Sequence, residues 1–321
     1  MDLRAVKLYL RGRLNMGLGA LLSTSPPGAP PPLSLEAVIG QAHPMPLDYV
    51  RLLEGRSNLE RQTLLGRVLE ARGTVSRQPY ATFEGRGENF VVEVGRSVPT
   101  LILIAHHDAV PWSPGANDNA SAIAILLDLL DRLSHDPPRS LSVRLLFTGG
   151  EEVGYLGARC YVKATSLDNV LGVVSLELCG IGDALVIWDA VPPADHSPML
   201  RAFSGALEAL GYRQDETYHV VGRIPVFGSD HRAFSALKMP AVGLTVVPSH
   251  EAAALRQFIF NPVRSLFRQL VRPPPPFETY HTALDRSSTL DPTSLARVSD
   301  ALWALVRALD EATTEDEVRR S

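Results

Sequence analysis

Apolar runs of strand length alternate with helix-patterned segments along most of the chain, which has 321 residues. The runs cover residues 90–94, 101–105, 141–148, 171–176, 184–188 and 241–247, and helical periodicity marks 120–133, 155–162, 197–210 and 293–309. Strands that are apolar along their whole length are buried on both faces, and strand–helix alternation favours parallel pairing. The pattern therefore predicts an α/β protein: a three-layer α/β/α sandwich whose central twisted sheet is mixed but mostly parallel, with helices on both faces.

The charge balance and the cysteine content exclude several classes of protein. The 31 Lys and Arg residues against 35 Asp and Glu give a formal net charge of −4, which excludes a strongly basic surface for nucleic acid. Two cysteines, Cys160 and Cys179, are too few for a disulfide scaffold or a Cys-based zinc finger. No stretch approaches the roughly 18 apolar residues of a membrane-spanning helix. We therefore expect a soluble globular enzyme without a transmembrane segment.

The first 45 residues have a pattern of their own. Apolar residues recur at spacings of three and four between Leu3 and Leu21, which predicts an amphipathic helix, and residues 25–32 form a stiff proline-rich linker. The basic start and short apolar patch also fit a signal peptide. We expect a retained helix and a cytoplasmic protein, with secretion as the alternative. Residues 46–312 are predicted to form one catalytic domain, followed by a polar tail at 313–321.

Imidazole and carboxylate side chains gather where the predicted strands end. His106 follows the run 101–105, Glu177 follows 171–176, and Asp118 stands at the start of a helix. Glu151 and Glu152 follow 141–148 after two glycines, and Asp108 lies two residues after His106. Ligands of open α/β sheets bind outside the carboxyl ends of the strands. Carboxylates converging there would repel one another, and bound divalent cations remove that cost. Histidine with carboxylate suits zinc, with cobalt or manganese as alternatives.

Each of these residues, taken alone, also has a structural interpretation. Asp118 fits a helix N-cap, together with its neighbouring asparagines, and His106 a hydrogen-bonded structural histidine. His107 is predicted to point the opposite way along its strand, and Cys179 to be a buried, inert thiol. Three contiguous residues seldom form a catalytic triad, so residues 229–231 (Ser-Asp-His) are expected to shape a loop through hydrogen bonds. The segment 249–276 fits either a specificity lid or a helix packed on the core.

Five segments in order along the chain resemble those of the co-catalytic two-zinc aminopeptidases of clan MH, whose relatives include glutamate carboxypeptidases and glutaminyl cyclases. The segments are His106-His107-Asp108, PGANDNAS at 114–121, GEEVGYLG at 150–157, Ser-Asp-His at 229–231 and Tyr-His-Thr at 280–282. The resemblance runs from about residue 55 to residue 309. It implies the zinc-exopeptidase form of the predicted sandwich.

The resemblance also implies a role for each matching residue. Asp118 bridges two metal ions; His106 and Glu177 complete one site, and Glu152 with His281 completes the other. Glu151 is the general base, and Tyr280 donates to the oxyanion. Asp108 steadies His106 through its other ring nitrogen or the local backbone, and Asp230 is expected to support the site from behind the ligands. Glu177 departs from the closest aminopeptidases, which have Asp at this point, and this puts in doubt the contact to a substrate's free amine.

The function implied is that of a metal-dependent exopeptidase, an aminopeptidase acting on peptides or small amides. Two divalent ions, expected to be zinc, activate a water molecule, and Glu151 takes the proton of that water. Two alternatives stay open: a glutaminyl cyclase-like acyltransferase using one metal, and a metal-free, receptor-like binding module. The side-chain specificity, the terminus that is recognised and the oligomeric state do not follow from the sequence.

Overall fold

Eight strands form one sheet in the part of the chain that the computed structural model describes, which comprises residues 6–10, 33–41, 43–95, 98–224, 227–251 and 278–320. The strands are β1 (Ser76–Ala81), β2 (Arg86–Val94), β3 (Thr100–His106), β4 (Ser142–Thr148), β5 (Val170–Leu176), β6 (Ala184–Trp188), β7 (Tyr218–Val220) and β8 (Ala241–Val247). Their order across the sheet is β1-β2-β4-β3-β5-β8-β6-β7. The four central strands β4, β3, β5 and β8 are parallel, whereas β1–β2, β2–β4 and β6–β8 pair antiparallel. The predicted mixed, mostly parallel sheet is confirmed.

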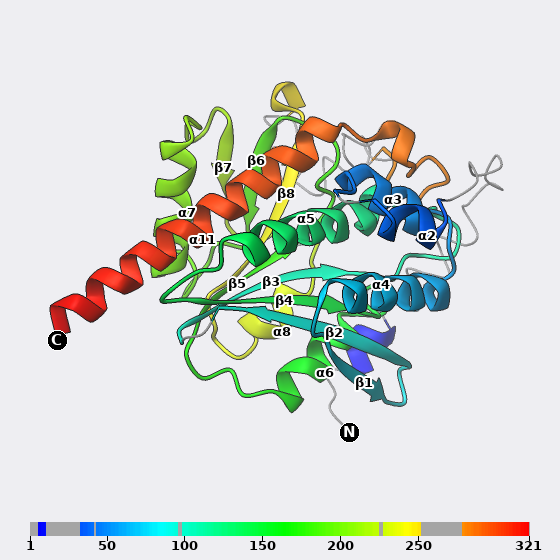
Figure 1. Ribbon diagram of the computed structural model, residues 1–321, viewed down its shortest axis with the longest axis horizontal. Helices are drawn as coiled ribbons and strands as arrows, with labels where there is room; N and C mark the ends of the chain where they lie inside the picture. The colour runs from blue at the N-terminus through cyan, green and yellow to red at the C-terminus, as the bar shows by residue number, and fades with distance from the viewer. Residues whose placement is uncertain are drawn as a thin grey trace.

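Helices cover both faces of this sheet (Figure 1). The helices of the described residues are α2 (Leu35–Ile39), α3 (Pro46–Leu53), α4 (Asn58–Arg72), α5 (Ser121–His135), α6 (Leu156–Ala164), α7 (Pro198–Ala209), α8 (His231–Ser235) and α11 (Pro292–Arg320). Short helical turns lie at Ala116–Ala120, Ser249–Glu251 and Ser287–Thr289. None of the helices of these residues has the length and apolar content to cross a membrane.

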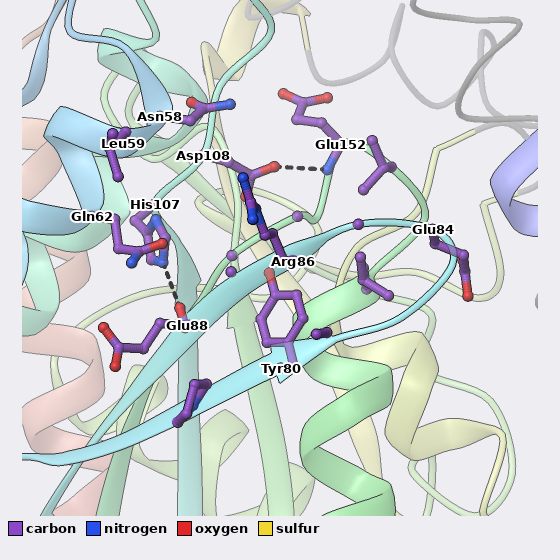
Figure 2. A pocket seen from close by; sticks show the side chains of 18 of the residues that line it. Asn58, Leu59, Gln62, Tyr80, Glu84, Arg86, Glu88, His107, Asp108 and Glu152 are labelled. Carbon is purple, nitrogen blue, oxygen red and sulfur yellow. Dashed lines mark hydrogen bonds between the residues drawn. The ribbon is translucent and has the colours of Figure 1, made fainter.

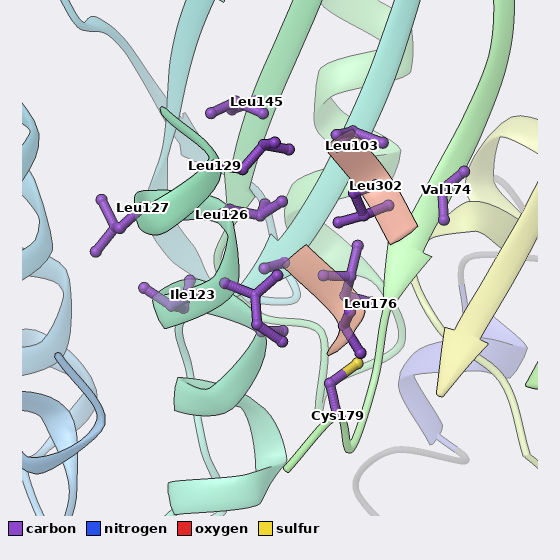
Figure 3. Packing of buried hydrophobic residues seen from close by; sticks show 14 of the residues in the cluster. Leu103, Ile123, Leu126, Leu127, Leu129, Leu145, Val174, Leu176, Cys179 and Leu302 are labelled. Atoms are coloured by element: carbon purple, nitrogen blue, oxygen red, sulfur yellow. The ribbon is translucent and has the colours of Figure 1, made fainter. Parts of the chain in front are cut away.

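Alternate side chains of β3 show the two faces directly. Leu101, Leu103 and Ala105 join the large core under α5, α7 and α11, whereas Ile102 and Ile104 join the smaller core under α6 and α8. Figure 3 shows Leu103 of β3, side chains of α5 and Leu302 of α11 in this large core. The strand is fully buried because its side chains alternate between two covered faces. The three-layer sandwich is therefore the observed architecture.

Local signals account for several helix ends. The Ser57 hydroxyl accepts the Glu60 N–H at the start of α4, and the helix ends at Arg72, just before Gly73. Ser197 caps α7 in the same way, with Pro198 in the first turn. The last helix is longer than the predicted 293–309, since α11 continues to Arg320 through most of the predicted tail.

The N-terminal region is described only in part. Residues 6–10 are helical, with Leu8 beside Gly154 and Tyr9 packed edge-on against Phe83. The rest of the predicted helix over 1–25, and the proline-rich linker at 25–32, lie outside the described residues. So does most of the segment 249–276 for which a lid was considered. Helix α2 buries Leu35 and Val38 in the large core, so the folded unit begins before the boundary predicted at residue 46.

Candidate active site

The predicted site residues meet at the carboxyl edge of the sheet. His106 ends β3, Glu177 follows β5 directly, and Glu152 lies on the loop after β4. These three strands are parallel neighbours, so their ends open on the same side. Asp118 comes from the turn Ala116–Ala120, and His281 from the segment before α11.

Asp118 lies between two histidines and faces each with a different oxygen. Its Oδ1 is 3.2 Å from His106 Nε2, and its Oδ2 is 3.1 Å from His281 Nε2. Glu177 Oε1 lies 3.5 Å from His106 Nε2, and Glu152 Oε2 lies 3.0 Å from His281 Nε2. Two groups result, His106–Asp118–Glu177 and Asp118–Glu152–His281, each with its donor atoms within 4.8 Å of one another. Asp118 belongs to both.

The chemistry of this donor set fits divalent cations. Asp118 and Glu177 are each 3% exposed, and no Lys or Arg among the described residues pairs with them or with Glu152. Burial by itself would lower the pKa of His106, but the charge of Glu177 and hydrogen bonds to neighbouring carboxylates raise it well above its ordinary value. Buried imidazole and carboxylate groups so close together, without a fixed cation, are the ligands that zinc takes in proteins.

Asp108 organises the site through its backbone and its side chain. The Nδ1 of His106 donates to the Asp108 carbonyl oxygen over 3.0 Å, which leaves Nε2 free to face the cluster. The Asp108 carboxylate accepts the backbone N–H groups of Glu151 and Glu152, at 3.0 and 3.2 Å. One residue thus orients the histidine and holds the loop that carries both glutamates.

The turn at Asp118 corrects one expectation. The polar residues 117–119 were expected to cap the helix that follows, but α5 begins at Ser121 without a side-chain cap. Asp118 has non-helical backbone angles instead, and its backbone N–H, like that of Asn117, donates to the buried carboxylate of Asp285. The Asp118 side chain is therefore free to face the histidines because Asp285 holds the turn.

Glu151 and Tyr280 border the cluster. Burial raises the pKa of Glu151 well above its ordinary value; the charge of His106 opposes this shift, and the charges of Glu177 and Glu152 add to it. The Tyr280 ring stacks on the His281 ring with centroids 3.8 Å apart, and Phe227 packs edge-on against Tyr280 at 5.8 Å. Burial, with nearby carboxylates, raises the pKa of the Tyr280 hydroxyl, so that group keeps its proton.

Residues 229–231 form no catalytic triad. Ser229 donates to Glu177, Thr148 donates to Asp230, and the His231 ring donates to Asp189 over 3.1 Å. The three side chains thus diverge, which confirms the expectation of loop-shaping hydrogen bonds. Asp230 is fully buried with one carboxylate oxygen unpaired, and burial raises its pKa to about 7.

Two other interpretations made from the sequence are confirmed. His107 turns away from the cluster, since its Nε2 donates to the Glu88 carbonyl oxygen over 3.0 Å. Cys179 is fully buried, and burial raises the pKa of its thiol, so it behaves as an inert core residue.

Sequence reasoning missed Asp285 and Arg61. The Arg61 side chain is fully buried behind the site, and its guanidinium donates to backbone carbonyls on both sides of the 108–115 loop, among them those of His107 at 2.6 Å and Gly115 at 3.2 Å. Asp285 follows His281 by four residues in a segment without hydrophobic periodicity. Both act on the backbone of residues that are distant in sequence, so no local pattern marks them.

A pocket of about 740 Å³ adjoins the cluster (Figure 2). It lies between the start of α4, the β1–β2 hairpin and the loop after β4, and Asp108 and Glu152 are part of its wall. Its size is within the usual range of small-molecule sites.

The architecture is that of zinc exopeptidases and glutaminyl cyclases. A zinc aminopeptidase from Bacillus subtilis superposes with a TM-score of 0.54 at 21% identity, covering 71% of this chain and 51% of that one. A glutaminyl cyclase from an Acidobacteriales bacterium gives 0.60 at 16% identity, covering 90% of this chain and all of the other. At these identities the likeness concerns the fold.

The family follows from the sequence match. The model of peptidase family M28 matches residues 89–306, more than half of the chain. The protein belongs to peptidase family M28. This confirms the resemblance seen in the five segments.

Curated relatives of two kinds match parts of the chain. A probable lipoprotein aminopeptidase, LpqL, from Mycobacterium tuberculosis is 36% identical over 92 residues, which are 29% of this chain and 18% of that protein. The BOS complex subunit NCLN from Canis lupus familiaris is 30% identical over 180 residues, 49% of this chain and 32% of that protein. The chain thus spans less than a third of the length of either relative.

Proposed function

We propose that the protein is a metal-dependent aminopeptidase that hydrolyses peptide or small amide bonds with two zinc ions and a glutamate base. One observation carries this proposal. The two oxygens of Asp118 face two different histidines, each of which has a further carboxylate beside it. A carboxylate shared between two such groups would suit a pair of divalent ions.

In this proposal His106, Asp118 and Glu177 hold one ion, and Asp118, Glu152 and His281 hold the other. Such a pair of ions, when bound, lowers the pKa of a water molecule and polarises the carbonyl that is attacked. Cobalt or manganese would suit the same donors. The remaining chemistry belongs to side chains of the chain itself.

Glu151 is proposed as the proton carrier. Its backbone N–H is fixed by the Asp108 carboxylate, and its raised pKa brings it nearer to the working pH of a general base. It would take a proton from the attacking water and deliver it to the leaving amine. In this step the side-chain carboxylate of Glu151 takes up one proton and then releases it.

Tyr280 is proposed to stabilise the developing oxyanion. Its hydroxyl stays protonated because the burial of the ring and the surrounding carboxylates disfavour a phenolate. Stacking against His281 at 3.8 Å fixes the ring relative to a proposed ligand.

Two further candidate functions have some support. The glutaminyl cyclase superposition covers the whole of that enzyme, which keeps intramolecular acyl transfer as a candidate. The match to NCLN, a subunit of the BOS complex, keeps the binding module as another. The five residues of the two groups and Glu151 are all present at this edge of the sheet. This complete set favours hydrolysis over acyl transfer and over a binding module.

Metal analysis combined with a substrate panel tests these candidates. The panel comprises leucine p-nitroanilide, its N-acetyl form and an N-terminal glutaminyl peptide, each with and without a chelator. Hydrolysis of the free substrate alone, abolished by chelator and restored by zinc, is expected. Cleavage of the N-acetyl substrate alone would overturn the aminopeptidase proposal. Cyclisation of the glutaminyl peptide would support acyl transfer instead. A protein that takes up no metal and converts none of the substrates would favour the binding module. Asp118→Asn, which changes the carboxylate shared by the two groups, is expected to lower both the zinc content and the turnover. Asp300→Asn, which changes an exposed carboxylate paired with Arg132, is its matched control.

A further inference from the structure

The pocket beside the cluster shares a wall with the loop that carries Glu151. Gly149, Gly150, Glu152 and Val153 all line it, and they immediately surround that glutamate in sequence. A group that delivers a proton to the leaving amine must lie next to the leaving fragment. The pocket is therefore placed to hold the part of a substrate that departs with the amine.

Three of the four acidic side chains of the pocket wall are already paired, and the fourth, Glu152, faces His281 in the cluster. Glu84 forms an ion pair with Arg159, and Glu88 forms one with Arg77 at 2.8 Å. Asp108 accepts two backbone N–H groups of the loop after β4. These carboxylates therefore offer little uncompensated negative charge to a ligand.

Arg86 is different from its charged neighbours. It is exposed at the start of β2, and among the described residues its guanidinium forms neither an ion pair nor a hydrogen bond. Figure 2 shows its side chain projecting from the hairpin into the pocket. A planar guanidinium with free donors is suited to bind a carboxylate through two parallel hydrogen bonds.

The rest of the wall is largely apolar. The apolar and aromatic lining residues include Leu59 of α4, Pro79 and Tyr80 of β1, and Val153 and Leu156 beyond the glutamates. Burying an apolar side chain there is favourable, whereas burying a charge without a partner is costly. The wall thus matches a ligand that combines one carboxylate with an apolar group.

We propose that this pocket binds the leaving side of the substrate and that Arg86 binds its carboxylate, which makes short peptides with a free C-terminal carboxylate and an apolar last residue the preferred substrates. This inference rests on the proposed function. It assigns Arg86 to substrate selection and gives the pocket a ligand class, that of the C-terminal residue of a di- or tripeptide.

The test compares substrates that share one scissile bond. Leu-Leu is compared with Leu-Leu-amide to measure the effect of a terminal carboxylate. Leu-Glu-amide is compared with Leu-Gln-amide to measure the effect of a side-chain carboxylate. The wild-type kcat/KM is expected to favour Leu-Leu over its amide by about fivefold, the scale of an exposed charge pair. Arg86→Gln should bring the ratio to about one through KM, Arg86→Lys should keep part of it, and Arg86→Glu should invert it. Arg213→Gln, which changes an exposed arginine paired with Glu216, is the matched control and should keep the wild-type ratio.

The failure of each proposal has its own signature. If the wild type hydrolyses the acid and the amide equally well, or if Arg86→Gln keeps the preference, the pocket assignment is wrong while the hydrolase assignment stands. If neither substrate is hydrolysed, the proposed function fails. The pocket assignment is then tested by measuring calorimetrically how tightly Leu-Leu and its amide bind to the zinc-loaded Glu151→Gln variant. Equal affinities for the two ligands there would overturn the assignment, and tighter binding of the acid that is lost with Arg86→Gln would support it.

Discussion

The buried carboxylate of Asp285 accepts a hydrogen bond from the backbone N–H of Asp118 over 3.1 Å. The same carboxylate accepts the N–H of Asn117 at 2.5 Å, so both of its oxygens hold the turn from which Asp118 projects. Asp285 lies four residues after His281, which faces the other side of Asp118 at 3.1 Å. One short segment therefore supplies a proposed ligand and the support for a second one.

Asp285→Asn is expected to weaken metal binding without removing any proposed ligand. An amide has one acceptor oxygen, so one of the two backbone N–H groups loses its partner, at a cost of about 1–3 kcal/mol in unfolding free energy. Loss of such support typically weakens metal affinity about 10–100-fold. Zinc competition with a fluorescent chelator measures the affinity. Asp300→Asn is the control, and wild-type zinc affinity in Asp285→Asn would show that the turn holds its shape without this carboxylate.

Glu151→Gln is expected to keep the metal content and lose about 10²–10⁴-fold in kcat. The amide keeps the backbone contact to Asp108 but cannot carry a proton. Glu152→Gln makes the informative comparison, because Glu152 contacts His281 at 3.0 Å and its loss should reduce metal content as well as activity. Elemental analysis and steady-state kinetics on both variants separate the two roles. Equal metal loss in both, or undiminished turnover in Glu151→Gln, would contradict the assignment.

Ser229→Ala tests whether Glu177 must be held by a hydroxyl. Ser229 is fully buried, and its hydroxyl donates to Glu177 and lies 3.0 Å from the Ser175 hydroxyl. Removing it should cost about 1–2 kcal/mol in unfolding free energy and lower the zinc affinity measured by competition. Ser235→Ala is the control, since that hydroxyl donates to a carbonyl within α8. A stability loss with unchanged zinc affinity would mean that Ser229 is structural only.

The central strands were predictable because a strand buried on both faces appears in the sequence as an apolar run. Strands β3, β4, β5 and β8 are covered on both faces, so most of their positions are apolar. Strand β1 (Ser76–Ala81) was missed because it lies at the sheet edge, is mostly exposed and contains Pro79. The three-residue β7 is too short to show a period.

The candidate site was predictable for a similar reason. His106, Glu152 and Glu177 stand at or just after the ends of recognisable strands, so the topology of an α/β sheet brings them together. Asp118 and His281 come from a turn and a loop, and His281 was assigned from the family resemblance alone. The residues that hold the site from outside the cluster show no such pattern in the sequence. Asp285 and Arg61 act on backbone groups 168 and 46 residues away, and a contact of that kind depends on the folded chain rather than on a local pattern.

The polar cluster around Asp189 gives a pH-dependent prediction. Asp189 is buried and accepts hydrogen bonds from Arg232 Nε at 2.7 Å, His231 Nε2 at 3.1 Å and the Ile224 N–H at 2.8 Å. Burial alone would raise the pKa of this carboxyl, but the contacts with His231 and Arg232 outweigh burial and hold it well below its ordinary value. A depressed carboxyl pKa stabilises the folded state above the unfolded pKa of about 3.9, and this contribution is lost as the pH falls through the folded value.

Asp189→Asn should therefore lower the unfolding free energy by about 3–5 kcal/mol at pH 7, because Arg232 is left without its buried partner. The difference from the wild type should narrow as the pH falls below about 4, where the wild-type protein begins to lose the same contribution. Urea unfolding at pH 7, 5 and 3 in the presence of a chelator measures this and keeps metal binding out of the comparison. Asp300→Asn should differ little from the wild type at any of these values. A difference for Asp189→Asn that stays constant from pH 7 to pH 3 would show that the ionisation of this carboxyl does not stabilise the fold.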